Sequence, residues 1–241
     1  MTTDDLDLSH IDKNVVVIPA AGKGTRFGDE RPKQYQLIGG EMVLDITLNI
    51  FLQMELFEKI ILIISPDDQY FEALSNIDNE KIIVIDGGDE RQFSVTNGLR
   101  YLYDNGLPDE TPVLVHDAVR PCLAPSDLKQ LLDSYTQNKQ ACFLAEKVTD
   151  SLKRVNQDNL VVENVERENI LHALTPQMTS FIELKNALSK VVKSEISVTD
   201  EVTALIDCDI PVKAVIANYP NPKITRPKDL LLAEKLLLSN S

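Results

Sequence analysis

The chain has 241 residues, a length that fits one large domain, and 43% of its residues are hydrophobic whereas only 5% are aromatic. This composition is typical of an aliphatic α/β core. The formal net charge of −14 excludes broad binding to nucleic acids or anionic membranes, because both depend on clustered basic surface.

The cysteines and the N-terminal segment indicate where the protein works. Cys122, Cys142 and Cys208 are widely spaced and show no zinc-ligand pattern with the three histidines. Their odd number favours free thiols in a reducing compartment. No apolar run approaches the roughly 18 residues of a membrane span, and the acidic segment 1–14 lacks the features of a targeting signal. We therefore expect a soluble, cytoplasmic protein.

The first predicted element is a buried strand at 15–18, where four β-branched residues run consecutively and Pro19 ends the run. Residues 20–24 are small apart from Lys23, so their backbone N–H groups can approach an anion closely. Four cations lie in or just after this loop: Lys23, Arg26, Arg31 and Lys33. The stretch predicts a site for nucleotide phosphates.

Two common phosphate fingerprints do not match this loop. The Walker A motif requires Ser or Thr after Gly-Lys, but Lys23 is followed by Gly24. The dinucleotide fingerprint requires a third glycine where Phe27 stands. A tight turn between strand and helix, with solvated lysines, is the plainer alternative.

The next elements alternate between helix and strand. Helical spacing predicts a helix at 42–52, and apolar runs predict buried parallel strands at 60–64 and 82–85. A short helix is expected at 67–74, with two aspartates at its positive end. This rhythm predicts right-handed crossovers in a doubly wound sheet.

The loop 87–91 ends the strand at 82–85 and precedes a helix near 95–102. Because the carboxyl ends of parallel strands share one edge of the sheet, Gly88 and Asp89 are expected to face the same crevice as the first loop. The plainer alternative is a glycine turn followed by an aspartate N-cap.

A third loop follows a predicted strand at 113–115 and contains Asp117 and Arg120. The two residues could form a simple ion pair. They could also hold a metal-bound triphosphate, with Asp117 toward Mg²⁺ and Arg120 toward a phosphate or the opposing carboxylate.

A helix at 128–135 and a strand at 142–145 come next, after which the composition changes at 146–170. Two short pieces there, 151–155 and 160–165, flank a four-residue loop and predict a hairpin. A lone hairpin is only marginally stable in water, so this one should lie against something.

The C-terminal part is predicted to contain a helix near 181–188, a second helix with Thr199 as its N-cap, a strand at 212–217 and a closing helix that starts at Pro227. Residues 172–177 receive no assignment.

Seven short motifs occur in order between residues 19 and 230: PAAGKGTRF, RPKQY, DGGDER, VHDAVRP, HALTPQ, TDE and KITRPKDL. Together they resemble the 2-C-methyl-D-erythritol 4-phosphate cytidylyltransferase family. The resemblance implies one Rossmann-like α/β domain over 1–241, with a mostly parallel doubly wound sheet and a protruding β-hairpin arm at 146–170. It also implies transfer of CMP from CTP to 2-C-methyl-D-erythritol 4-phosphate, with release of pyrophosphate, in non-mevalonate isoprenoid biosynthesis.

The resemblance further implies roles toward the nucleotide. The loop residues Pro19, Ala20, Ala21, Gly22, Lys23 and Gly24 would cradle CTP, and Gly88, Asp89 and Ser94 would surround cytosine and ribose. Asp117 would bind both the nucleotide and Mg²⁺ or another divalent cation. Arg26 and Lys33 would be catalytic, because they would stabilise charge on the α-phosphate.

The second substrate would be bound by Asp117, Arg120, Ser151, Arg167, Thr199 and Lys223, of which Arg167 and Lys223 would also be catalytic. Ser151 stands where the family usually has threonine, and its hydroxyl can still donate to a phosphate. The family forms homodimers through its arm, so Arg167 is expected to serve the partner's site across a twofold axis.

The expected chemistry needs no covalent intermediate, since no Ser–His or Cys–His pair suggests one. Alignment and charge neutralisation are enough when the attacking group is itself a phosphate. The nearest alternative is a ribitol-5-phosphate cytidylyltransferase, although the first loop and residues 172–177 resemble the methylerythritol enzyme more. Two others are a sugar-1-phosphate nucleotidyltransferase and a nucleotide sensor without catalytic activity.

Overall fold

The computed structural model describes residues 7–22, 27, 31–194 and 197–239. Within this part of the chain, seven strands form the main sheet: β1 (Asn14–Pro19), β4 (Phe57–Ile64), β5 (Ile82–Asp86), β6 (Pro112–Val115), β7 (Cys142–Lys147), β10 (Leu171–Ser180) and β11 (Lys213–Ile216). The helices are α1 (Val43–Leu52), α2 (Arg91–Asp104), α3 (Pro125–Asn138), α4 (Phe181–Lys193), α5 (Glu201–Ile206) and α6 (Pro227–Ser239).

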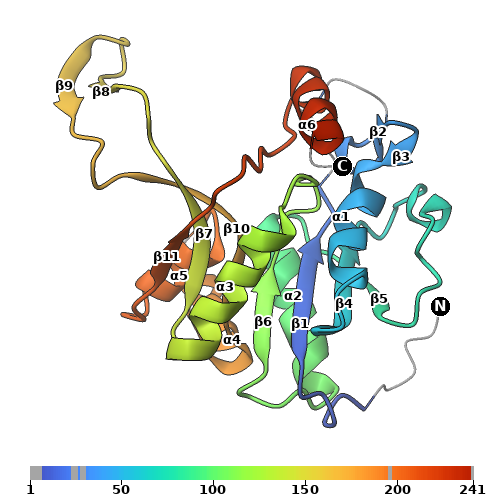
Figure 1. Ribbon diagram of the computed structural model, residues 1–241. Coiled ribbons are helices and arrows are strands. Elements are labelled where there is room, and N and C mark those ends of the chain that lie inside the picture. The colour runs from blue at the N-terminus through green and yellow to red at the C-terminus, as the bar shows by residue number, and fades with distance from the viewer. Residues whose placement is uncertain (1–6, 23–26, 28–30, 195–196, 240–241) are drawn as a thin grey trace.

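The strand order is β11-β7-β10-β6-β1-β4-β5 (Figure 1). Neighbouring strands are parallel except at β10, which runs antiparallel to both β6 and β7. The predicted α/β class with a mostly parallel sheet is confirmed. No helix within the described ranges is both long and apolar enough to cross a bilayer.

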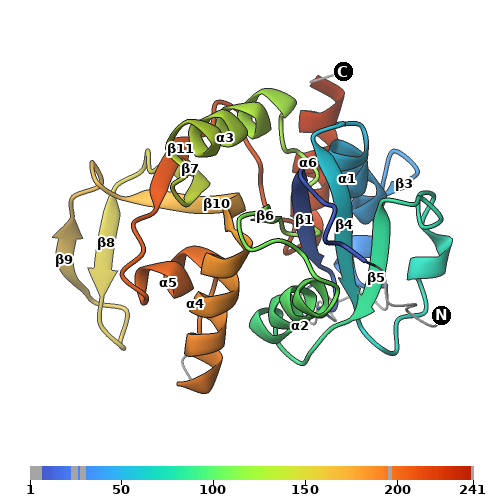
Figure 2. The same cartoon turned by 90° about the horizontal axis from the view of Figure 1, so that it is seen from below.

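The central strand β1 is covered on both faces. Val16 and Ile18 belong to the core beneath α1 and α3, whereas Val15 and Val17 belong to the core beneath α2 and α4. All four are fully buried, as expected when successive side chains of an apolar strand point to opposite faces. Figure 2 shows α1 and α3 on one side of the sheet and α2, α4 and α5 on the other.

The crossover between β4 and β5 contains less helix than predicted. An α-helix over 67–74 is wrong, because only the 3₁₀ turn η2 (Phe71–Ala73) forms there. The carboxylate of Asp68 accepts hydrogen bonds from the N–H groups of Tyr70 and Phe71, at 2.8 and 3.1 Å. A second 3₁₀ turn, η1 (Lys33–Tyr35), precedes the short strands β2 (Leu37–Ile38) and β3 (Glu41–Met42).

Strand β10 was not predicted at all. It lies in the middle of the sheet, although it carries Pro176 and several buried polar residues, among them Thr175, Gln177 and Thr179. Its register shifts between Ala173 and Gln177 against β7. The neighbours of β10 explain these polar side chains, because Thr175 and Gln177 hydrogen-bond to Asp117 and Asp200, which are described below.

The arm consists of β8 (Leu152–Val155) and β9 (Val161–Val165), which pair antiparallel as predicted. It projects away from the main sheet at the upper left of Figure 1. Leu160, Val161 and Val162 near its tip are 63%, 64% and 59% exposed. Exposed apolar side chains grouped on a two-stranded ribbon are typical of an element that contacts another molecule.

Candidate active site

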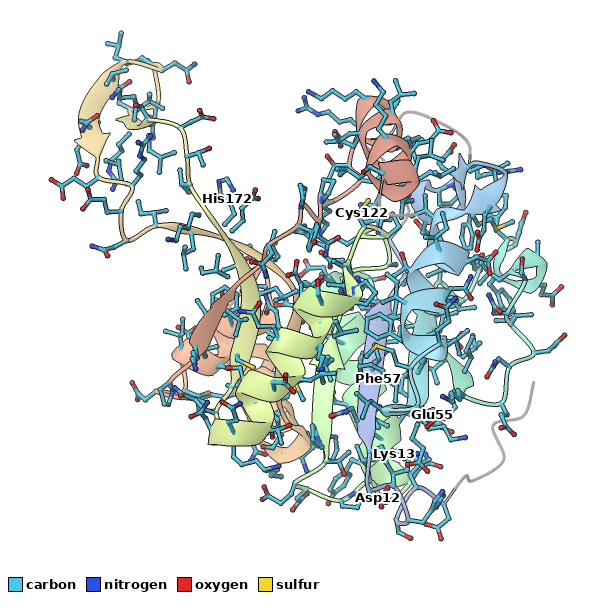
Figure 3. All side chains as sticks on the ribbon, viewed as in Figure 1. Asp12, Lys13, Glu55, Phe57, Cys122 and His172 are labelled. Carbon is cyan, nitrogen blue, oxygen red and sulfur yellow. The ribbon has the colours of Figure 1, made fainter. Side chains whose placement is uncertain are left out.

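A pocket opens at the carboxyl ends of β1, β5 and β6, the edge at which open α/β sheets bind ligands. In Figure 3 this edge lies toward Cys122 and away from Lys13 and Phe57. The structure brings together the following predicted site residues in its lining: Pro19, Ala20, Ala21, Gly22, Lys33, Gly88, Asp89, Ser94, Asp117 and Lys223.

Other predicted residues lie elsewhere. Arg120 is buried directly beside Asp117, and Thr199 stands exposed just before α5. Ser151 and Arg167 flank the strands of the arm, where the Arg167 guanidinium donates to the backbone carbonyl of Thr149. Three predicted residues lie outside the described ones: Lys23, Gly24 and Arg26.

The loop after β1 is fixed to its surroundings through its backbone. The N–H of Ala20 donates to the carbonyl of Ile63 at 2.7 Å, so it continues the sheet and does not face the pocket. The N–H groups that can meet an anion therefore begin at Ala21. On the other side, a Cβ atom added at Gly87 would lie 2.5 Å from the Cβ of Ala21. Gly87 thus lets the β5–α2 loop pack against the first loop.

The β5–α2 loop is held by Ser94 from the first turn of α2. The hydroxyl oxygen of Ser94 accepts a hydrogen bond from the N–H of Gly88 at 3.1 Å. The alternative in which Asp89 caps α2 is wrong, since the N-cap residue is Glu90, whose side chain makes no capping bond. Asp89 lines the pocket instead.

Asp117 lies among three cations on the floor of the pocket. Its Oδ2 is 2.9 Å from Nζ of Lys223 and 3.3 Å from Nε of Arg120, and its Oδ1 is 3.2 Å from Nε of Arg91. The simple ion pair between Asp117 and Arg120 therefore exists, but as one part of a larger network. The guanidinium of Arg120 also donates to the carbonyl of Asn221 at 2.6 Å, which ties it to the segment that precedes Lys223.

Two members of this network were missed in the sequence. The guanidinium of Arg91 makes two parallel bonds to the carboxylate of Glu201, at 2.7 and 3.0 Å. Arg91 opens α2 and Glu201 opens α5, so their 110-residue separation gives no local signal. The predicted N-cap Thr199 is also wrong, because Asp200 caps α5 by accepting from the N–H of Thr203 at 3.0 Å.

Burial and charge shift the pKa values of this network in opposite directions. Burial alone would raise the pKa of Asp117, but Arg91, Lys223 and Arg120 outweigh it and hold that pKa well below its usual range. Burial likewise opposes the charge on Arg91, and the carboxylates of Glu201 and Asp117 outweigh it and raise its pKa. Asp117 and Arg91 are therefore ionised at neutral pH.

His116 supports the Asp117 turn from behind. Because the Arg120 carbonyl can only accept, Nε2 of His116 donates to it at 3.1 Å. Nδ1 then accepts from the Thr175 hydroxyl at 3.0 Å, and the oxygen of that hydroxyl accepts from the N–H of Asp117 at 3.1 Å. This chain needs neutral imidazole, and burial lowers the pKa of His116 to about 4.

We expect the free energy of unfolding to fall by about 2 kcal/mol between about pH 7 and about pH 5 on account of His116 alone. The folded pKa of about 4 lies below the ordinary value of 6.5. The unfolded chain therefore takes up the proton first as the pH falls. Urea unfolding of the wild type and of His116→Asn, which cannot titrate, at both pH values measures this. An equal pH dependence in the two proteins would contradict the assignment.

The described residues offer little to a metal on their own. No group of three or more His, Cys, Asp or Glu residues suited to a metal occurs among them. Of the four or so lone-pair directions of a carboxylate, Asp117 uses one on Oδ1 and two on Oδ2. One direction on Oδ1 remains. This fits a divalent cation that arrives on a polyphosphate and takes one protein carboxylate, as Mg²⁺ commonly does.

The geometry suits the binding and alignment of two phosphate-bearing molecules. Backbone N–H groups of the first loop and the cations Lys33, Arg91 and Lys223 face one pocket. Lysine and arginine remain charged at neutral pH, so they can neutralise a crowded anionic transition state without titrating. Cys122, Cys142 and Cys208 are free thiols; the first two are buried, and burial raises their pKa to about 11 and about 12. These two are unsuited to nucleophilic attack.

Comparison with known proteins gives one consistent result. The model of the 2-C-methyl-D-erythritol 4-phosphate cytidylyltransferase family matches residues 14–239. The protein of that name from Pseudoalteromonas atlantica is 40% identical over 219 residues, which cover 91% of this chain and 93% of the relative. The one from Vibrio parahaemolyticus is 38% identical over 225 residues, which cover 93% of this chain and 95% of the relative.

Solved structures agree with the sequences. The crystal structure of 2-C-methyl-D-erythritol 4-phosphate cytidylyltransferase from Francisella tularensis is 33% identical, with a TM-score of 0.80, and the match covers 93% of this chain and all of that one. A crystal structure of 4-diphosphocytidyl-2C-methyl-D-erythritol synthase is 30% identical, with a TM-score of 0.81 over 93% of this chain and 98% of that one.

Proposed function

The chain belongs to the 2-C-methyl-D-erythritol 4-phosphate cytidylyltransferase family, and from this membership we propose how its pocket carries out the reaction. The enzyme is a nucleotidyltransferase of non-mevalonate isoprenoid biosynthesis that transfers CMP from CTP to 2-C-methyl-D-erythritol 4-phosphate and releases pyrophosphate. The observation that carries this function is the family match across nearly the whole chain, together with a pocket that the first loop and three cations line.

CTP binds with its phosphates on the loop after β1 and its nucleoside against the β5–α2 loop. The N–H groups of Ala21 and Gly22 meet phosphate oxygens, while Gly88 and Asp89 meet cytosine and ribose. The packing of Gly87 on Ala21 supports this arrangement, because it sets the two loops at a fixed spacing. Lys33, with Arg26, neutralises charge on the α-phosphate, and Lys23 and Gly24 extend the cradle.

The second substrate binds beside Asp117. Lys223 pairs with this carboxylate and also lines the pocket. Its ammonium can therefore orient the attacking phosphate toward the α-phosphorus. Arg120 holds Asp117 in place, and Thr199 and Ser151 donate to the polyol phosphate. Asp117 would help to hold Mg²⁺ or another divalent cation that arrives with CTP, and the cation would supply further positive charge to the triphosphate.

The arm within 146–170 acts as a dimerisation element of a single domain that spans 1–241. Its exposed Leu160, Val161 and Val162 support this role, because a second copy would cover them. In a twofold dimer, Arg167 enters the partner's site and binds the second substrate there. We place the enzyme in the cytoplasm, in keeping with its free cysteines.

Pyrophosphate release tests the function directly. With CTP, Mg²⁺ and 2-C-methyl-D-erythritol 4-phosphate, we expect steady release of pyrophosphate and formation of 4-diphosphocytidyl-2-C-methyl-D-erythritol. Ribitol 5-phosphate in place of the methylerythritol compound tests the nearest alternative, and a panel of nucleoside triphosphates tests the sugar-1-phosphate one. Faster turnover of ribitol 5-phosphate, or CTP binding without release of pyrophosphate, would refute the proposal.

A further inference from the structure

Gln34 joins the turn that carries Lys33 to the loop after β1. Its side-chain Nε2 donates to the carbonyl of Ala20 at 2.7 Å and to the carbonyl of Gly22 at 3.2 Å. The residue is only 3% exposed, although it lies in the lining of the pocket. Because both partners are carbonyl oxygens, only the NH₂ end of the amide can face them, and both of its hydrogens are used.

These two bonds complete what the first loop needs in order to face an anion. When the N–H groups of successive residues point toward a phosphate, the carbonyls on either side point away from it into the protein. A buried carbonyl without a donor is costly. Ala20 is buried whereas Gly22 is exposed, so this cost applies to the carbonyl of Ala20. Because one amide group donates to both carbonyls, it fixes the backbone on either side of Ala21.

The same residue fixes Lys33. Lys33, Gln34 and Tyr35 form the single turn η1. Tyr35 is fully buried, and its hydroxyl donates to Oδ2 of Asp68 at 2.7 Å. The backbone of Lys33 is therefore anchored on one side to the β1 loop, through Gln34, and on the other to the loop after β4, through Tyr35. The long, flexible side chain of Lys33 therefore starts from a fixed backbone position.

We propose that Gln34 is a positioning residue for nucleotidyl transfer, which sets the first loop and Lys33 at the spacing that the phosphates of CTP require. It acts through these groups and does not itself carry the reaction. The inference rests on the proposed function, and it adds to it a residue whose chemistry can be tested separately from the overall activity.

The variant Gln34→Glu gives the sharpest test, since it keeps the shape and removes the donor. A carboxylate against two carbonyl oxygens in a buried place has a raised pKa. When protonated, its O–H can again donate to one carbonyl. At about pH 8.5 we expect kcat/KM for CTP to be about 10²-fold below wild type, the scale of a small misplacement of reacting groups. The ratio of variant to wild type should recover about tenfold toward about pH 6.

The kinetic constants separate positioning from general damage. Gln34→Glu should lower kcat and raise KM for CTP, while KM for the alcohol phosphate stays within about twofold of wild type, because that substrate meets Lys223 and the other side of the pocket. Gln34→Ala should show the same split at every pH without recovery. If Gln34→Glu does not fold, an unchanged kcat and KM for CTP in Gln34→Ala would overturn the proposal.

Gln36→Glu is the matched control. Gln36 lies two residues further on, and its amide donates to the carbonyl of Arg31 at 2.8 Å rather than to the first loop. The control makes the same substitution in the same region, and we expect both a smaller loss and a smaller recovery at low pH, because Gln36 does not contact the first loop. An equal loss in both Glu variants, or a pH-independent ratio for Gln34→Glu, would overturn the proposal. Absence of activity in the wild type would instead refute the proposed function.

Discussion

Replacing Lys33 with alanine is expected to lower kcat by about 10²-fold or more, the loss found when a preorganised charge-stabilising donor is removed. Lys33 lines the pocket and begins the turn η1, which Gln34 and Tyr35 hold in place. Under the proposed mechanism, the ammonium meets the developing charge on the α-phosphate without reorganisation. Steady-state pyrophosphate release measures the effect.

Lys59→Ala is the control for this variant. Lys59 is the third residue of β4, two residues after Phe57, and its ammonium donates to the Glu80 carbonyl at 3.0 Å. Figure 3 shows Phe57 at the end of the sheet that lies away from Cys122. We expect wild-type turnover from it. Near wild-type turnover of Lys33→Ala would show that the transition-state role assigned to Lys33 is wrong.

The same variant tests the exchange of arms. A Lys33→Ala chain can still lend Arg167 to a partner, whereas an Arg167→Ala chain keeps its own Lys33 and lends nothing. When the two are unfolded and refolded together in equal amounts, about half of the dimers are mixed and have one complete site of two, given reciprocal twofold exchange. Roughly a quarter of wild-type activity should return. If Arg167 acted within its own subunit, mixing would restore none.

Replacing Arg91 with alanine is expected to reduce the free energy of unfolding by about 3–5 kcal/mol, because it leaves a buried carboxylate without its partner. The side chain of Glu201 is only 3% exposed and loses both of its bonds to the guanidinium. Asp117 keeps Arg120 and Lys223, so the cost falls chiefly on Glu201. Urea unfolding at neutral pH measures the change.

Arg154→Ala provides the contrast. Arg154 pairs with Glu163 at 2.6 Å, and their side chains are 63% and 54% exposed. Removal of such a surface pair should leave the free energy of unfolding almost unchanged. A second variant, Arg91→Met with Glu201→Met, should recover much of the lost stability, since it leaves neither charge unpaired. If Arg91→Ala and Arg154→Ala lowered the free energy of unfolding by similar amounts, the prediction that the buried Glu201 carboxylate depends on Arg91 would be wrong.

The sequence predicted those elements in which buried apolar residues recur at the regular spacing of a strand or a helix. Strand β1 and helix α2 are examples: four β-branched residues in a row require cover on both faces, and Val95, Leu99 and Leu102 repeat at the helical interval. The loops that follow β1, β5 and β6 could be placed at one edge because parallel strands share it. The pocket residues taken from these loops do lie together.

Strand β10 could not be predicted in this way, because its central residues are polar and hydrogen-bond to residues around the site. Thr175 supports the Asp117 turn, and the side chain of Gln177 donates to Asp200 at 3.1 Å and accepts from the N–H of Val202 at 2.9 Å. A strand is usually recognised by alternating apolar residues, but here polar residues that make these hydrogen bonds stand in their place. Similarly, nothing near Arg91 in the sequence indicates that its partner is Glu201.

Strand β10 also decides the order in which a nascent chain can complete this fold. When the ribosome has made β1 to β7, strands β6 and β7 each still present an open edge of the kind that invites aggregation. β10 fills the gap between them, but its polar residues become favourable to bury only when Asp117 and the start of α5 are in place. The strand that fills the centre of the sheet thus also holds the Asp117 turn, through Thr175, and the start of α5, through Gln177.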